Sequence, residues 1–310
     1  MAAAMNQLTF KAAAAKVSVP ASSANLGPGF DSLCLALEIR DEYVAQILDG
    51  DGADIDVIGE GADEIARDAK NLVYKSMMFG FKFMGKVPKG IAIRAKNSIP
   101  QGRGMGSSAS AIVGGLSLAR ALVVGGDQYM TNDDLIALGT ELEGHPDNVA
   151  AALLGGATIA WMENLVGKEF GKAITIPVAA EIKAVVFLPE NHLATSKARK
   201  LLPDTVPYRD AVINSSRSAL LVYALSHRPD LLFAATEDHL HQEYRGVAMP
   251  KSLELVKKLR AAGIAATISG AGPSVLVLHT NNDQELADIV SMAPDSFKPL
   301  VLEVSQSGAK

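Results

Sequence analysis

The sequence is poor in the features that mark several other classes of protein. Its single cysteine, Cys34, excludes an intramolecular disulfide and any cysteine-rich metal site, which is typical of a reducing compartment. No apolar stretch reaches the roughly 18 residues that a membrane-spanning helix needs. Residues 1–16 lack the apolar segment and cleavage site of a secretory signal. We therefore expect a cytoplasmic protein with no membrane partner, in which Cys34 packs as a buried thiol.

The chain also lacks an excess of positive charge. Its 29 Lys and Arg residues stand against 34 Asp and Glu residues, which gives a net charge of −5 with neutral histidines. A nucleic-acid binder needs a basic face to displace counterions, so we expect no nucleic-acid partner. A small anionic ligand stays compatible with this balance, because a few local dipoles can outweigh a weak overall field. At 310 residues the chain is long for one core, and two domains are expected.

Apolar periodicity and turn residues predict an α+β fold, because strands and helices are mixed without the steady βαβ alternation of a doubly wound sheet. A capping box is predicted at residues 131–134, and Gly114 and Gly115 in a long helix predict close approach of a neighbouring element. Strands are expected at residues 17–20, 33–39, 43–48, 54–58, 91–95, 182–188, 265–269, 275–279 and 299–304. Helices are expected at residues 71–84, 108–124, 131–144, 195–202, 208–226, 229–240, 250–262 and 284–292.

A glycine-rich stretch that follows a predicted strand and enters a long helix is the most informative part of the sequence. Alternate glycines let the backbone turn tightly and expose successive N–H groups, and two serines follow where the cap and first turn of the helix are expected. A helix N-terminus offers unpaired N–H donors and partial positive charge, which suits a polyphosphate. A plain glycine-rich turn with a serine cap is the alternative, and the absence of Gly-Lys-Ser/Thr excludes a Walker A loop. The candidate ATP-binding residues are Pro100, Gln101, Gly102, Arg103, Gly104, Met105, Gly106, Ser107, Ser108, Ala109 and Ser110.

The stretch PQGRGMGSSASA resembles the phosphate loop of the GHMP kinases, with Met105 where leucine is usual. Two further motifs of that family occur in the expected order, PASSANLGPGFDSLCLAL at residues 20–37 and SGAGPSVLVL at residues 269–278. The similarity runs from about residue 16 to residue 304, and three ordered motifs are far more specific than one. The resemblance implies a kinase of a small molecule that uses ATP and Mg²⁺ and is commonly a homodimer.

The resemblance also implies a two-domain α+β fold. Its N-terminal domain, placed at residues 1–158, would be an S5-like α/β domain with a left-handed βαβ unit that binds ATP. Its C-terminal domain, placed at residues 159–310, would be ferredoxin-like. The loop at residues 270–273 would pack against the phosphate loop and shape the acceptor pocket, with a plain hairpin turn as the alternative.

Within the family, three segments favour the branch that phosphorylates the hydroxyl of L-homoserine. They are EGHPDN at residues 143–148, TSKAR at residues 195–199, and residues 241–245. The implied reaction gives O-phospho-L-homoserine, in threonine biosynthesis. A kinase for another small alcohol, and a kinase-like binding protein without turnover, are the alternatives.

Homoserine is a zwitterion, so its site must pair an ammonium and a carboxylate. The resemblance assigns the ammonium to Asp31 with Asn25 beside it, and the carboxylate to Arg199 and Arg245, whose guanidinium forks can grip both oxygens. Thr195 could add a hydroxyl contact. From the residues alone, Asn25 is also explained as a turn residue, Asp31 as a cap and each arginine as a solvated helix charge.

The resemblance places His145, Asp147 and Asn148 against the acceptor as catalytic residues. Asn148 and His145 would orient the substrate, and Asp147 is the candidate base. Phosphoryl transfer depends mainly on alignment and charge neutralisation, so direct transfer without a dedicated base is the alternative. A lone histidine at such a position is otherwise a cap or a buried hydrogen-bonding residue.

Glu143 is the candidate Mg²⁺ carboxylate, with Ser108 as its hydroxyl partner and Ser107 on phosphate. Glu141 competes with it, because two positions apart on a regular helix the two side chains point in different directions. An acid at a helix C-terminus is unfavourable to the dipole, which supports a metal role over an exposed helix end.

Overall fold

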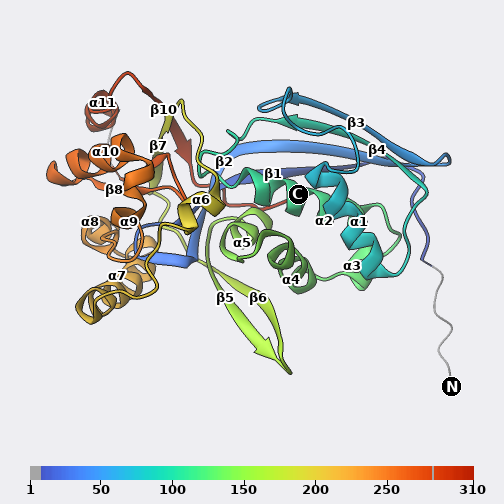
Figure 1. The fold of residues 1–310 in the computed structure, drawn as a ribbon, viewed down its shortest axis with the longest axis horizontal. Coiled ribbons are helices and arrows are strands. Elements are labelled where there is room, and N and C mark those ends of the chain that lie inside the picture. The colour runs from blue at the N-terminus through green and yellow to red at the C-terminus, as the bar shows by residue number, and fades with distance from the viewer. Residues whose placement is uncertain (1–7, 281–282) are drawn as a thin grey trace.

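The computed structural model describes residues 8–280 and 283–310, which form two β-sheets with helices packed on each (Figure 1). Residues 1–7, on which part of the secretory-signal expectation depends, lie outside the described residues. The first sheet and its helices comprise β1 (Ala15–Asn25), β2 (Gly29–Leu48), β3 (Gly52–Gly59), α1 (Leu72–Met84), β4 (Gly90–Asn97), α2 (Ser107–Ala121), α3 (Gly126–Tyr129), α4 (Asn132–Glu143), α5 (Asp147–Leu154), β5 (Ala157–Leu165) and β6 (Lys168–Ile176).

The first sheet has the order β3-β4-β2-β5-β6, and β1 pairs with β2 beside this path. Side chains alternate along its strands as a half-buried sheet requires: Ile55 and Val57 of β3 are buried while Asp54 and Asp56 are exposed. The helices α1, α2, α4 and α5 pack together on one face of this sheet (Figure 1). One face of the sheet therefore belongs to the hydrophobic core, and the other face is exposed to solvent.

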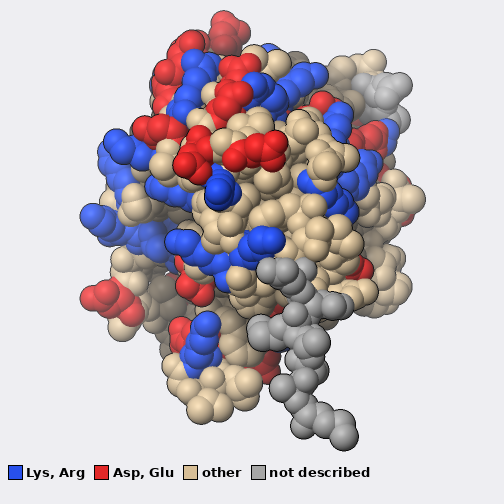
Figure 2. All heavy atoms as spheres, turned by 90° about the vertical axis from the view of Figure 1, so that its right-hand side faces the viewer, with Lys and Arg blue, Asp and Glu red and all other residues tan. Residues whose placement is uncertain are grey.

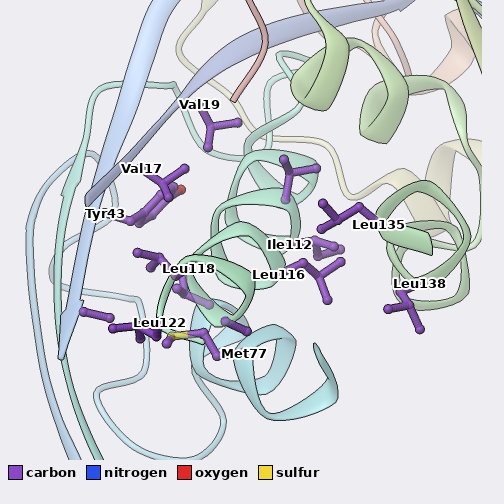
Figure 3. Close-up of a cluster of buried hydrophobic side chains, with 14 of the residues drawn as sticks. Val17, Val19, Tyr43, Met77, Ile112, Leu116, Leu118, Leu122, Leu135 and Leu138 are labelled. Atoms are coloured by element: carbon purple, nitrogen blue, oxygen red, sulfur yellow. The ribbon is translucent and has the colours of Figure 1, made fainter. Parts of the chain in front are cut away.

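The helix α2 runs through the middle of this domain. Tyr43 and Val17 of the sheet lie on one side of it, Met77 of α1 below, and Leu135 of α4 on the other side (Figure 3). The expected close approach at the glycines is confirmed, since a Cβ on Gly114 would lie 2.4 Å from the ring of Tyr43. A buried helix with a fixed axis gives the glycine-rich loop in front of it a rigid base.

The second sheet is antiparallel, with the order β10-β7-β9-β8. This is the 4-1-3-2 order expected of a ferredoxin-like βαββαβ unit, and it confirms the α+β prediction. Strand β7 contributes to two cores, because Val185 and Phe187 pack with α10 while Ala184 and Val186 pack against the first domain and α7. The elements are β7 (Lys183–Pro189), α6 (Thr195–Arg199), α7 (Tyr208–Ser226), η1 (Pro229–Leu231), α8 (Leu232–Ala235), α9 (Gln242–Arg245), η2 (Gly246–Ala248), α10 (Pro250–Ala261), β8 (Ala265–Ile268), β9 (Val275–His279), α11 (Asp283–Ser291) and β10 (Phe297–Glu303).

Two sequence predictions of structure were wrong, and one hairpin was not predicted. The two strands expected at residues 33–39 and 43–48 are one strand, because Asp41 between them is buried with its carboxylate satisfied by hydrogen bonds. The hairpin β5–β6 was missed because much of it is exposed on both faces, which erases the alternation of apolar residues. The helix expected at residues 229–240 stops at Ala235, since Asp238 accepts backbone N–H groups of the next turn.

The hairpin β5–β6 belongs to the first sheet, although most of it follows the domain boundary predicted at residue 158. That boundary stays a prediction. The capping box at the start of α4 is confirmed, because Thr131 accepts from the backbone of Asp134 and the Asp134 carboxylate accepts from the backbone of Thr131. Cys34 is fully buried, as expected.

After β10 the chain returns to the first domain as a short C-terminal segment, residues 304–310. Backbone hydrogen bonds join Ser18 and Lys310 in both directions, at 2.7 and 3.0 Å. The Arg40 guanidinium donates to the Ser305 hydroxyl and to the carbonyls of Ser307 and Gly308. The last residues of the second domain are thus held by β1 and β2.

The surface carries charges of both signs. Lys and Arg side chains stand among Asp and Glu side chains on the face at the right-hand side of Figure 1, seen head-on in Figure 2. Of the helices in the described part of the chain, none combines the length and apolar character needed to span a bilayer.

Candidate functional site

The glycine-rich loop connects β4 to α2 and lies against two other segments. Gly102, Gly104 and Gly106 have φ angles of 62°, 72° and 70°, in the left-handed region that favours glycine. A Cβ on Gly104 would lie 2.2 Å from the Ser269 carbonyl oxygen, and one on Gly106 would lie 2.0 Å from the hydroxyl of Ser22. Close packing and backbone conformation both demand glycine here, so the loop has one shape.

The predicted serine cap of α2 was wrong. The N-cap residue is Gly106, in the left-handed conformation and with no side-chain cap hydrogen bond, and Ser107 and Ser108 are the first two helical residues. Gly106 turns the chain into the helix without a capping hydroxyl. The Ser108 hydroxyl instead donates to Glu143 Oε1 at 2.5 Å. Both serines line the cavity described below, at the positive end of a helix of 15 residues.

The predicted ATP-binding loop divides into residues that line the cavity and residues that support it. Gln101, Gly102, Gly104, Gly106, Ser107 and Ser108 line it. Pro100, Arg103, Met105, Ala109 and Ser110 are not among the lining residues, and all but Arg103 are buried. Met105 packs in the core between the domains, and Arg103 donates to the Glu190 carbonyl at 3.3 Å.

The loop at residues 270–273 meets the glycine-rich loop, as expected. The Ser269 hydroxyl donates to the Gly104 carbonyl at 2.6 Å and lies 2.8 Å from the Ser23 hydroxyl. The Gly270 N–H donates to the Ala24 carbonyl at 3.0 Å. Gly270 and Ala271 line the cavity, so this loop is more than a hairpin turn.

Sequence reasoning missed Asp41, which holds both ends of the glycine-rich loop. Its Oδ1 accepts the backbone N–H groups of Ser98 and Ile99 at 2.7 and 2.9 Å. Its Oδ2 accepts the hydroxyls of Ser110 and Tyr43 at 2.9 and 3.0 Å. Burial raises the pKa of Asp41, and the two backbone donors oppose that rise. One carboxylate thus joins β2, the residues that follow β4 and the first turn of α2. Asp41 stands in the mostly charged segment 38–42, so its local sequence does not mark it as buried.

The acceptor side of the site begins with a left-handed turn between β1 and β2. Asn25, Leu26 and Gly27 have φ angles of 73°, 49° and 87°, and Asp31 has 53°. The Asn25 side chain accepts from the Asp31 N–H at 3.0 Å and donates to the Gly270 carbonyl at 2.8 Å. The turn role considered for Asn25 is thus present in the structure, and the same side chain lines the cavity.

Asp31, predicted to pair an ammonium, and Arg199, predicted to pair a carboxylate, contact each other. Arg199 Nη1 and Nη2 donate to the two oxygens of Asp31 at 2.7 and 2.9 Å, a two-pronged ion pair at the wall of the cavity. The hydrogen bond and charge of Asp31 raise the pKa of Arg199. Thr195 begins the short helix α6 that carries Arg199, and it lines the same cavity.

Arg245 is the largest side chain that the fold buries completely, with 1% of its surface exposed. Its Nη1 lies 3.4 Å from the Gly270 carbonyl and 3.4 Å from His241 Nδ1, and its Nε has no hydrogen-bond partner among the described residues. Its guanidinium lies over the ring of Phe30, 5.0 Å from the centroid. Burial, and next the charge of Arg199, lower the pKa of Arg245. A buried cation with an unused donor beside a cavity suits an anionic ligand.

Asp147 is buried, and its carboxylate contacts both His145 and Asn148. Its Oδ1 accepts the Asn148 N–H at 2.7 Å and lies 2.6 Å from His145 Nδ1. Burial alone would lower the pKa of His145, but the hydrogen bond and charge of Asp147 outweigh it and the pKa is raised. Asn148 Oδ1 accepts the Ser22 hydroxyl at 2.9 Å, and its amide nitrogen donates to Asp147 Oδ1 over a long 3.4 Å, which leaves its second N–H for another partner. All three line the cavity.

Glu143 and Glu141 lie in different environments. Glu143 lines the cavity beside Ser108, while Glu141 is exposed and is not a lining residue. Burial raises the pKa of Glu143, and the Ser108 hydrogen bond and the charge of His145 oppose that rise. The described residues contain no group of three His, Cys, Asp or Glu side chains suited to a metal ion.

The side chains above converge on one cavity of about 340 Å³ between the two sheets, a size typical of small-molecule sites. Beyond the glycine-rich loop, the cavity continues into an apolar end that sequence reasoning did not find. Asn97 lies there, and its Oδ1 is buried without a hydrogen-bond partner among the described residues. The apolar lining residues of this end are Tyr43, Val57, Ile65, Leu72, Val73 and Ala95.

Comparison with known families agrees with the geometry. The model of the GHMP kinases N-terminal domain matches residues 71–156, and the model of the GHMP kinases C-terminal domain matches residues 221–299. A homoserine kinase of Streptomyces avermitilis is 50% identical over 301 residues, which cover 97% of this chain and 96% of the relative. A homoserine kinase of Mycobacterium tuberculosis is 45% identical over 294 residues, 94% of this chain and 93% of the relative.

Solved structures give the same result. The crystal structure of a homoserine kinase from Cytophaga hutchinsonii superposes with a TM-score of 0.81 and 28% identity, over 97% of this chain and 98% of that one. A mevalonate diphosphate decarboxylase from Staphylococcus aureus has a TM-score of 0.66 at 14% identity, over 96% of this chain and 97% of that one. The second likeness concerns the fold alone.

Proposed function

Because the chain belongs to the homoserine kinases of the GHMP kinase family, we propose that its central cavity holds ATP and L-homoserine end to end. The reaction moves the γ-phosphoryl group of ATP to the side-chain hydroxyl of L-homoserine, giving ADP and O-phospho-L-homoserine in threonine biosynthesis. One observation carries the assignment of the site. The buried guanidinium of Arg245 stands at the wall of the cavity that the N-terminus of α2 also lines.

The phosphate tail of ATP lies on the glycine-rich loop in this proposal. Gly104 and Gly106 bring the main chain to the cavity wall, and the first N–H groups of α2 have no partner within the helix. These donors are fixed in place by the fold, so they need no reorganisation as charge develops on the transferred phosphoryl group. The adenine would occupy the apolar end, where Asn97 Oδ1 is free to accept from an exocyclic amine.

Glu143 and Ser108 fit a Mg²⁺ ion that is held mainly by ATP. Mg²⁺ commonly keeps phosphate oxygens and waters and takes only one or two protein ligands, so the lack of a three-ligand cluster in the described residues is compatible with it. A desolvated carboxylate whose one hydrogen-bond donor is a neighbouring hydroxyl suits a cation. Bound there, the ion would neutralise charge on the phosphates.

L-Homoserine would bind by opening the ion pair of Asp31 and Arg199. Its ammonium replaces the guanidinium at Asp31, and its carboxylate replaces the Asp31 carboxylate at Arg199 while also reaching Arg245. Each charged group keeps a partner in both states, so little desolvation is left uncompensated. Thr195 lies on the same wall and can add a hydroxyl contact.

The acceptor hydroxyl would be aligned by Asn148 and His145, with Asp147 holding both. Asp147 accepts from Asn148 and lies 2.6 Å from His145, which favours an orienting role for it over that of a base. The transition state of phosphoryl transfer is largely dissociative, so alignment matters more than a strong base. The hydroxyl proton passes to an oxygen of the transferred group as the new P–O bond forms.

The hairpin β5–β6 offers a surface for the expected homodimer. It projects from the body of the molecule (Figure 1), and β6 is the last strand of the first sheet. Leu165, Val166 and Ile174 on it are exposed. A two-fold pairing of this hairpin would cover those side chains. Light scattering at micromolar concentration tests the idea: a species near 32.5 kDa would contradict it, and Val166→Lys should weaken a dimer of twice that mass.

The site assignment is tested by ADP release with homoserine, threonine, mevalonate and galactose as acceptors, at saturating ATP and Mg²⁺. We expect turnover with homoserine, and Arg245→Ala should raise the KM for homoserine far more than the KM for ATP. Arg228→Ala is the matched control, since Arg228 pairs with Asp230 at the surface. Turnover only with another alcohol would reassign the substrate, no turnover would favour a binding protein, and equal effects on both KM values would remove the carboxylate clamp.

A further inference from the structure

His241 lies behind the acceptor end of the cavity and is not one of its lining residues. It is 1% exposed and precedes α9, four residues before Arg245. Its ring stacks on Phe30 at 5.2 Å with an angle of 30° between the planes. Phe30 in turn lies under both arginines of the site, with the Arg199 guanidinium 5.7 Å and the Arg245 guanidinium 5.0 Å from its centroid.

The two ring nitrogens of His241 contact opposite parts of the acceptor site. Nε2 lies 2.9 Å from the carbonyl oxygen of Gly27 and 3.6 Å from Oδ1 of the buried Asp238, and Nδ1 lies 3.4 Å from Nη1 of Arg245. A carbonyl only accepts and a guanidinium only donates, so the arrangement requires a neutral ring with its proton on Nε2. Burial lowers the pKa of His241. The charge of Asp238 opposes this shift and the charge of Arg245 adds to it, and the lowered pKa is in keeping with a neutral ring.

Gly27 belongs to the left-handed turn that carries Asn25 and leads to Asp31. His241 therefore connects the turn that presents the ammonium partner to the arginine that presents the carboxylate partner. The distance between those two groups must match the distance between the charged ends of one amino acid. A single neutral imidazole, donating on one side and accepting on the other, sets that spacing.

We propose that His241 is a positioning residue for the acceptor: it holds the Arg245 guanidinium by accepting through Nδ1 while it anchors the turn through Nε2. This inference rests on the proposed role of Arg245 as a carboxylate partner. It deepens that role by assigning the placement of the guanidinium to a residue that does not touch the substrate. Loss of the Nδ1 acceptor should weaken homoserine binding without changing ATP binding.

Two amide substitutions separate the two contacts. In His241→Gln the amide nitrogen can stand at the place of Nε2 and donate to Gly27, but no acceptor stands near Arg245. In His241→Asn the amide oxygen can stand at the place of Nδ1 and accept from Arg245. We expect His241→Gln to raise the KM for homoserine about tenfold with an unchanged KM for ATP, and His241→Asn to recover most of that loss. The exposed His227→Gln serves as the control.

The decisive readout is coupling, which a general structural defect would not produce. In an Arg245→Ala background, adding His241→Gln should leave the KM for homoserine unchanged, because the contact has already been lost. A further tenfold rise there, or equal rises in both KM values in the single variant, would overturn the inference. If Arg245→Ala itself leaves the KM for homoserine unchanged, the carboxylate clamp fails instead, and the two failures are distinguished.

A measurement on the unmodified protein guards against variants that fail to fold. Nitrogen-15 spectra of protein labelled at histidine report which ring nitrogen carries the proton. We expect one histidine to stay neutral with the proton on Nε2 from pH 8 down to pH 6, and its signal to be the one that His241→Asn removes. A His241 ring protonated on Nδ1 in that range would contradict the proposal.

Discussion

The two ends of the cavity are lined by different kinds of chemical group. The part proposed for the phosphates is mostly main chain from one continuous segment, in which Gly104 and Gly106 pack closely against Ser269 and Ser22. The acceptor end is made of charged side chains from three separate elements, the turn with Asp31, α6 with Arg199 and α9 with Arg245. In the proposed function, one end would recognise a phosphate chain that every ATP-dependent enzyme shares, and the other would recognise a single small zwitterion.

The difference has a physical basis. Main-chain donors cannot be removed by substitution, except by proline, so the glycine-rich loop is sensitive chiefly to changes that alter its shape. Charged side chains need partners when they are partly buried, and at the acceptor end Asp31 and Arg199 supply each other. On the proposed binding mode, the loop would need no rearrangement to bind phosphate, whereas the acceptor end would exchange an internal ion pair for the substrate. Four substitutions sharpen or break this contrast.

Gly104→Ala should have the largest effect. The new Cβ would lie 2.2 Å from the Ser269 carbonyl at a φ of 72°, so the loop has to move away from its neighbour. A displacement of about 1 Å in such a site costs roughly 100-fold, and we expect at least that loss in kcat/KM for ATP. Gly85→Ala is the control, since Gly85 has a φ of 94° and nothing within 4 Å of a Cβ. Equal losses in both variants would mean that strain alone matters.

Glu143→Gln should follow, with a fall of about 50-fold in kcat that is partly regained at high Mg²⁺ concentration. The amide keeps the size of the side chain and the hydrogen bond with Ser108 but loses the charge. Activity is measured across a Mg²⁺ titration. Glu141→Gln, at an exposed position on the same helix, should behave like the unmodified enzyme. The reverse pattern would exchange the two assignments.

Asp31→Asn tests the acceptor end. The variant cannot pair an ammonium, so the KM for L-homoserine should rise about 20-fold while the KM for ATP holds. An acceptor without the amino group, 4-hydroxybutyrate, should be a poor substrate for both proteins and lose little further in the variant. Parallel losses with both acceptors would show that Asp31 serves only to hold Arg199. Asp54→Asn, which removes an exposed ion pair with Arg94, is the control.

Asp41→Asn should have the smallest effect and fall at the nucleotide end. The remaining oxygen can still accept from Ser98 and Ile99, and the hydroxyls of Tyr43 and Ser110 can turn to accept from the new amide. We expect the KM for ATP to rise about fivefold with little change for homoserine. A rise confined to homoserine would separate Asp41 from the phosphate loop.

How much was predictable differs between the two ends for the same reason. The glycine spacing of the loop has a local cause, so its position between a strand and a helix was read from the sequence and confirmed by the structure. The serine cap was wrong, because a glycine in the left-handed conformation can begin a helix without a capping hydroxyl. The acceptor residues had no local signature and entered through resemblance alone, and their roles are proposals.

The residues that sequence reasoning missed act on other residues. Asp41 looked like part of a charged break between strands, and its partners, the N–H groups of Ser98 and Ile99, lie more than 50 residues away in the chain. Phe30 lies within a motif that drew attention to its neighbours. The apolar end of the cavity is lined by ordinary core side chains such as Val57 and Ala95, and nothing in their local sequence distinguishes them from the rest of the core. Such roles depend on three-dimensional juxtaposition.

The C-terminal segment, residues 304–310, limits how the enzyme can open. The chain crosses from the first domain to the second after β6 and comes back through this segment, which Arg40 and Ser18 hold. Because the chain connects the two domains at two separate places, twisting or wide separation of the domains is resisted. Removal of the last residues would take away these contacts with Ser18 and Arg40, at a distance from the cavity.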